Sequence, residues 1–190
     1  MLKTGKPSRQ IMTNSIRIDY HGMRPYLQEA VIKVNELFRT EQFYDNIASH
    51  HAFDMADTPP QTIAVLMRKA SLDMYVDLYY SMSPIKNIDG YDDMDTPSLI
   101  HINIWKLDRP VASICNTLVH SCVHAVNAYH NQYYFGHGNE PVAGKENTAP
   151  YRIGAIAQHM IAKEEIPFTL EHDVLKVGQI PIRDFMPAIC

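Results

Sequence analysis

The sequence predicts one α+β domain, in which helices cover a single, mostly antiparallel sheet. Two observations support this fold class. The predicted segments follow the order helix, strands, buried helix, loop, helix, and 190 residues of which 46% are hydrophobic suffice for one core and little more. We therefore expect a flexible N-terminal arm at residues 1–15 and a single domain over residues 16–190.

The first half of the chain supplies one helix and the strands. Apolar residues recur at helical spacing from Arg24 to Phe38, and Pro25 suits the first turn. After the breaker "DTPPQ", the apolar run "TIAVLM" (62–67) predicts a buried strand. Apolar and polar residues alternate in "LDMYVDLY" (72–79) and again in "LIHINIW" (99–105), which indicates two half-exposed strands.

The second half is predicted to be helical around a long loop. A helix from about Val111 to at least Asn127 is apolar on all but a narrow stripe, so we expect it to be the buried central helix. The loop from Gly136 to Pro150 is rich in glycine and proline, and loops of this length are often functional. A second helix follows, from about Pro150 to Glu164.

Composition excludes several classes of function. A formal net charge of -4 argues against non-specific binding of nucleic acid, which needs a basic surface. Polar or charged residues interrupt every apolar run well before it could span a membrane. The polar N-terminus has no apolar signal region, which predicts a cytoplasmic protein or one exported without a classical signal peptide. Three cysteines, an odd number, favour a reduced fold.

The chemistry is concentrated in "LVHSCVHAVNAYH" (118–130) within the central helix. Residues four apart share one helix face, so His120 and His124 can reach the same ion. Imidazole nitrogens are common zinc ligands, and a catalytic zinc takes three protein ligands plus water. The sequence therefore predicts a zinc site whose third ligand comes from elsewhere.

The spacing of His120, His124 and His130 resembles the motif H-E-x-x-H-x-x-G-x-x-H of the metzincin clan of zincin metallopeptidases. The resemblance covers eleven residues by motif, and the order of helix, strands and buried helix is also similar to a zincin catalytic half-domain. It implies a zincin-like catalytic domain, zinc as the cofactor, and a glutamate directly after the first histidine as the general base. The chain departs from the motif at two positions, where Ser121 replaces the glutamate and Asn127 replaces the glycine.

Three residues compete for the place of the third ligand. Asparagine tolerates a left-handed turn, so the chain can bend at Asn127 and bring His130 to the metal. If the helix continues, Asn127 shares the histidine face and His137, between two glycines, becomes the alternative. Glu146, or a residue of the second helix as in the gluzincin arrangement, is a further candidate.

Ser121 leaves three explanations open, because a serine hydroxyl does not ionise near neutral pH. The serine is a substitution that silences the enzyme, or the chain is a natural pseudoenzyme, or Glu140 or Glu146 supplies the base.

We expect a zinc metallohydrolase, most simply a peptidase acting on a peptide or protein. Its oxyanion is predicted to accept a hydrogen bond from Tyr151 or Tyr134, with Tyr133 as a further candidate. A small lone zincin is similar to bacterial toxin-like or effector peptidases. The alternatives are a non-catalytic, metal-stabilised binding module and, less favoured, a thiol hydrolase that uses Cys122.

Overall fold

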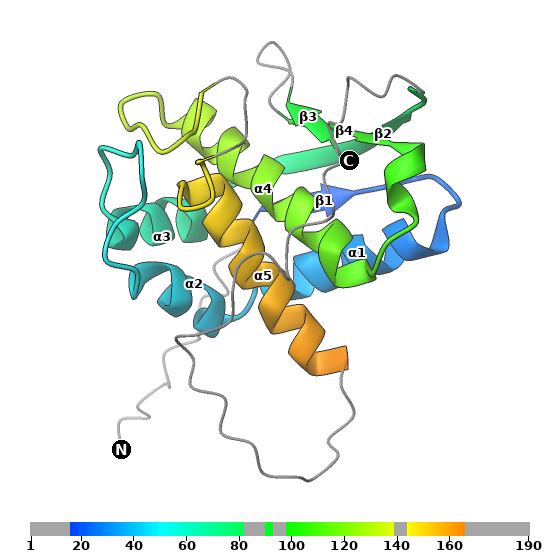
Figure 1. The fold of residues 1–190 in the computed structure, drawn as a ribbon, viewed down its shortest axis with the longest axis horizontal. Helices are drawn as coiled ribbons and strands as arrows, with labels where there is room; N and C mark the ends of the chain where they lie inside the picture. The colour runs from blue at the N-terminus through cyan, green and yellow to red at the C-terminus, as the bar shows by residue number, and fades with distance from the viewer. Residues whose placement is uncertain (1–15, 82–89, 93–97, 139–143, 166–190) are drawn as a thin grey trace, which may run out of the picture.

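The computed structural model describes residues 16–81, 90–92, 98–138 and 144–165 (Figure 1). The arm expected at residues 1–15 lies outside this part of the chain. The elements, in chain order, are β1 (Arg17–Asp19), α1 (Pro25–Leu37), α2 (Glu41–Ala48), α3 (Pro60–Lys69), β2 (Asp73–Tyr79), β3 (Gly90–Asp92), β4 (Leu99–Asn103), the 3-10 helix η1 (Ile104–Leu107), α4 (Val111–Tyr129) and α5 (Ala149–Glu165).

The sheet is mostly parallel, so the predicted, mostly antiparallel sheet is wrong. Its strands lie in the order β1-β2-β4-β3. The pairs β1–β2 and β2–β4 are parallel, and the short edge strand β3 alone runs antiparallel to its neighbour β4. The connection between β1 and β2 contains three helices, and a long helical crossover of this kind returns the chain in the same direction. A two-residue hairpin, by contrast, would reverse it.

The segment "TIAVLM" is helical, which overturns the strand predicted there and adds a helix to the connection between β1 and β2. Pro60 occupies the first turn of α3, where its missing N–H costs nothing. Ile63, Ala64 and Met67 are buried while Val65 is 44% exposed, a periodicity that fits a helix and not a buried strand. A short apolar run does not by itself distinguish the two.

The core lies between one face of the sheet and the helices. Ile18, Met74, Ile100 and Ile102 project from the strands into it and are almost completely buried. Helix α4 packs against α1 and α5, and Figure 1 shows α5 crossing in front of it. As predicted, α4 is the central buried helix. None of the described helices combines the length and apolarity needed to cross a bilayer.

Strand β1 has one edge that no other strand covers in the described sheet, and α1 occupies it with a side chain. Asn35 accepts a hydrogen bond from the N–H of Ile18 at 2.9 Å and donates one to the carbonyl of Ile18 at 2.8 Å. The two backbone groups in the middle of β1 are thus both satisfied.

Candidate metal centre

The first two histidines of the centre lie on the half-buried stripe of α4. Most of this helix is buried, whereas His120 and His124 belong to the few positions that keep partial exposure. One turn of helix separates them, so their side chains project side by side. Their Nε2 atoms are 3.2 Å apart.

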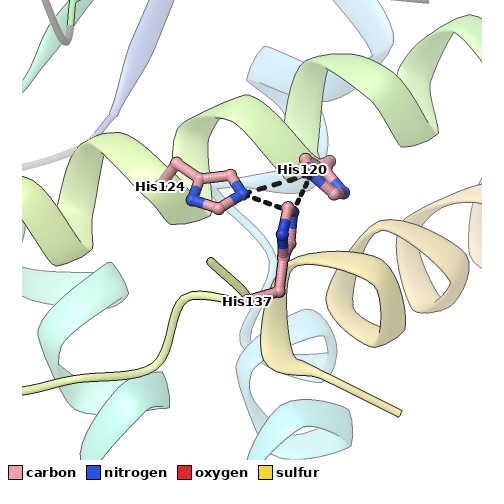
Figure 2. Close-up of side chains that lie close together, drawn as sticks. All are labelled: His120, His124 and His137. Atoms are coloured by element: carbon pink, nitrogen blue, oxygen red, sulfur yellow. Dashed lines mark hydrogen bonds between the residues drawn. The ribbon is translucent and has the colours of Figure 1, made fainter. Parts of the chain in front are cut away.

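His137 joins them from the loop that follows α4 (Figure 2). Its Nε2 atom lies 2.9 Å from that of His124 and 3.2 Å from that of His120. Its Nδ1 atom lies 2.7 Å from the carbonyl oxygen of Gly138, which fixes the tautomer because only a protonated Nδ1 can donate to a carbonyl. In a neutral His137 the Nε2 lone pair therefore faces the other two rings.

The close approach of the Nε2 atoms is not explained by protonation of His120 or His124, because both pKa values are lowered. Burial first, then the charges of His124 and His137, hold the pKa of His120 well below its usual value. Burial, followed by the charge of His137, lowers the pKa of His124 to about 3. Both rings are thus neutral at pH 7, and neutral imidazole is the form that binds metal ions.

The triangle of nitrogens fits one small divalent ion. With Zn–N bonds of ~2.0–2.1 Å and a tetrahedral angle, two histidine nitrogens on one zinc lie ~3.3–3.4 Å apart. The observed separations of 2.9 to 3.2 Å require adjustments of only tenths of an ångström. In the part of the chain that the structure describes, this is the one group of histidine, cysteine and acidic side chains with ligand atoms close enough to hold a metal.

Of the predicted tyrosines, Tyr151 lies against the histidines and Tyr134 lies near the loop that carries His137. The ring of Tyr151, on α5, makes an edge contact with His120 at a centroid distance of 4.5 Å and lies 5.0 Å from the ring of His137. Tyr134 is exposed, and its hydroxyl lies 4.0 Å from the position a Cβ atom would take on Gly138. Tyr151 is therefore the nearer of the two oxyanion candidates to the histidines.

The structure separates the remaining candidate ligands from the cluster. Helix α4 does not bend at Asn127 but runs on to Tyr129, so His130 ends the helix and its ring packs against that of Tyr129. Glu146 is half-buried and is not among the three clustered residues. Glu140, the other possible base, lies outside the described residues. The third member of the cluster is His137, as the alternative assignment has it, and not His130.

Ser121 and Cys122 follow His120 on α4 and are both buried. Ser121 is 4% exposed, and Cys122 is completely buried in the middle of the helix. A nucleophilic cysteine needs access to substrate and an environment that lowers its pKa, such as a helix N-terminus. The position of Cys122 weighs against a thiol hydrolase.

The orientation of the His137 ring could not be predicted from the sequence. The carbonyl of Gly138 sets this orientation, and Gly138 adopts a positive φ of 63°. The two glycines in "FGHGN" were the only signal, since glycine reaches such φ values without strain.

Comparisons with known proteins do not name a family. The chain matches no protein-family model, no curated protein and no solved structure. The resemblance to zincins therefore rests on the spacing of the histidines in the sequence alone, and the structure adds a cluster of His120, His124 and His137 that could bind a metal ion.

Proposed function

We propose that this chain is a zinc-dependent metallohydrolase of the zincin type that acts on peptide or protein substrates, and that Ser121 leaves it inactive or weakly active. The observation that carries the proposal is the convergence of three histidine Nε2 atoms, two of them from an H-x-x-x-H helix. Three protein ligands leave a fourth position open, which is typical of catalytic zinc and not of structural zinc.

His120, His124 and His137 would hold the ion, because their Nε2 atoms already lie within 3.2 Å of one another. Zinc in such a site supplies a Lewis acid and lowers the pKa of a coordinated water molecule to ~7. Tyr151 lies against two of the three rings, from where its phenol can donate a hydrogen bond to the developing oxyanion. Ser121, at the position of the metzincin base, cannot accept and return a proton efficiently near neutral pH, and the loss of a general base costs ~10²–10⁴ in rate.

Metal content is the first test. The purified protein should carry about one zinc per chain, and His120→Ala and His124→Ala should each abolish its retention. His101→Ala is the matched control, because His101 lies on β4 beside Asp77 and outside the cluster. Zinc content that neither cluster variant lowers would disprove the metal centre.

The second test restores the base. Ser121→Glu should raise peptide hydrolysis by at least ~10², the lower end for a general base. Ser121→Gln is the control, since glutamine fills the same space at this buried position but has no ionisable carboxylate. The double variant Ser121→Glu, His120→Ala provides the blank. A broad peptide digest provides the substrates.

Ser121 itself favours the second candidate, a metal-stabilised binding module without catalysis. A Ser121→Glu protein that folds and holds zinc, yet cleaves no more than Ser121→Gln, would reject the peptidase and leave this module. Peptide hydrolysis by Ser121→Glu but not by Ser121→Gln would reject the binding module.

A further inference from the structure

The segment that leads to His137 is held from one side by a residue of α4. Asn127 donates a hydrogen bond from Nδ2 to the carbonyl of Tyr133 at 2.8 Å, and its Oδ1 accepts one from the N–H of Phe135 at 2.9 Å. Asn127 lies three residues after His124 and is half-buried on the histidine stripe. It therefore ties the segment to the same helix that carries the other two histidines.

The opposite side of the segment is held by the loop before α3. The N–H of Tyr134 donates to Oδ1 of Asp57 at 2.9 Å, and the N–H of Asp57 donates to the carbonyl of Tyr134 at 3.0 Å. The hydroxyl of Thr58 donates to the same carboxylate oxygen at 2.8 Å, which keeps the side chain of Asp57 in place. Four backbone groups on three successive residues, 133 to 135, are thus bonded from two sides.

These contacts determine the position of the backbone just before His137. The side chain of Phe135 is completely buried, so the segment is also anchored in the core. Only Gly136 separates Phe135 from His137, and the Nδ1 contact with Gly138 then orients the ring. The backbone that leads to the third histidine is therefore positioned by contacts that involve none of the three imidazoles, and only the orientation of the ring depends on an imidazole contact.

We propose that Asn127 and Asp57 are positioning residues that place His137 in the histidine cluster before a metal ion arrives. This inference rests on the proposed metal centre and specifies how its third ligand is preorganised. The contacts that position metal ligands are typically worth a factor of ~10–100 in metal affinity. Asn127 should have the larger effect, because its bonds connect the segment directly to α4.

Asn127→Leu tests the proposal, since leucine is close to asparagine in size but forms neither hydrogen bond. Its matched control is Asn35→Leu, because Asn35 makes the same pair of bonds to the backbone of Ile18, far along the chain from the cluster. In a zinc titration against a competing chelator, Asn127→Leu should weaken binding by ~10–100-fold and Asn35→Leu should not change it. Equal affinities for the two variants would overturn the proposal.

Asp57→Ala is a second variant at an exposed position, where folding is expected to survive. It should also weaken zinc binding, by less than Asn127→Leu. In a background with His137→Ala, neither change should affect the remaining affinity. An effect of the same size in that background would show that the two residues act on something other than His137.

Hydrogen exchange of the metal-free protein separates this proposal from the metal centre itself. The amide of Phe135 donates a hydrogen bond to Asn127. It should therefore lose protection in Asn127→Leu and keep it in Asn35→Leu. Unchanged protection in Asn127→Leu overturns the positioning role, whether or not zinc binds. Lost protection in a protein that binds no zinc supports the positioning role and rejects the proposed function.

Discussion

Replacing one histidine at a time decides which residue completes the metal centre. We expect His137→Ala to lose most of the zinc affinity and His130→Ala to leave it unchanged. In the structure, the Nε2 atom of His137 lies within 3.2 Å of both other Nε2 atoms, whereas the ring of His130 packs on Tyr129 at the end of α4. The metzincin spacing alone would predict the reverse.

The size of the loss can be estimated from the number of ligands. Structural zinc sites bind with ~10–16 kcal/mol through four ligands, so one ligand accounts for about 3 kcal/mol, or roughly a factor of 10² in affinity. At saturating zinc, the stabilisation that the metal provides falls by the same ~3 kcal/mol. For a chain of 190 residues this amounts to a loss of ~6–12 °C in the zinc-induced rise of Tm.

Thermal unfolding with excess zinc and with excess chelator measures this quantity directly. The wild type and His130→Ala should show the same rise in Tm on adding zinc, and His137→Ala should show a much smaller one. The Tm in chelator serves as the control for folding of each variant. A full zinc-induced rise in His137→Ala, together with its loss in His130→Ala, would refute the assignment of the third ligand.

Three further outcomes are expected. In the unfolded chain histidine titrates near ~6.5, whereas in the folded chain burial keeps His120 and His124 neutral to much lower pH, so the metal-free protein should lose stability as pH falls below ~6.5. His124→Gln should reduce the slope of the free energy of unfolding against pH, measured by urea unfolding at several pH values, by up to ~1.4 kcal/mol per pH unit. An unchanged slope would contradict the lowered pKa of His124. Gly154→Ala should destabilise the protein by about 1–3 kcal/mol in the same assay. A Cβ atom at this position meets the backbone oxygen of Asn116 at 3.0 Å, where α5 crosses α4. Wild-type stability of this variant would mean that the helices separate easily. Tyr151→Phe, added to Ser121→Glu, should retain zinc but lower the rate of peptide hydrolysis by ~10²-fold. Equal rates with and without Tyr151→Phe would exclude its phenol as the oxyanion donor.

The elements with long, regular patterns could be predicted from the sequence. Helix α4 was expected from about Val111 to at least Asn127 and runs from Val111 to Tyr129, because its nearly continuous apolar surface suits only a buried helix. The strand direction could not be predicted in this way. Whether two strands are parallel depends on the connection between them, and neither β1 nor the helix over residues 62–67 was predicted.

The site was predictable in its helical half and ambiguous in its loop half. The pairing of His120 with His124 follows from helix geometry alone. The choice between His130 and His137 depends on whether the chain turns at Asn127, and local preference allows the turn. In the structure α4 continues through Asn127, whose side chain donates to the carbonyl of Tyr133 and accepts from the N–H of Phe135, and no local pattern reveals such partners.

The contact between Asn35 and Ile18 has a consequence for self-association. An uncovered edge strand normally offers its backbone groups to a strand of another molecule, and proteins must block such edges to stay apart. Here one asparagine occupies both groups of the central residue of β1, so a helix side chain stands where a neighbouring strand would dock. The sheet is therefore capped on this side, and strand-by-strand polymerisation through β1 would first have to displace Asn35.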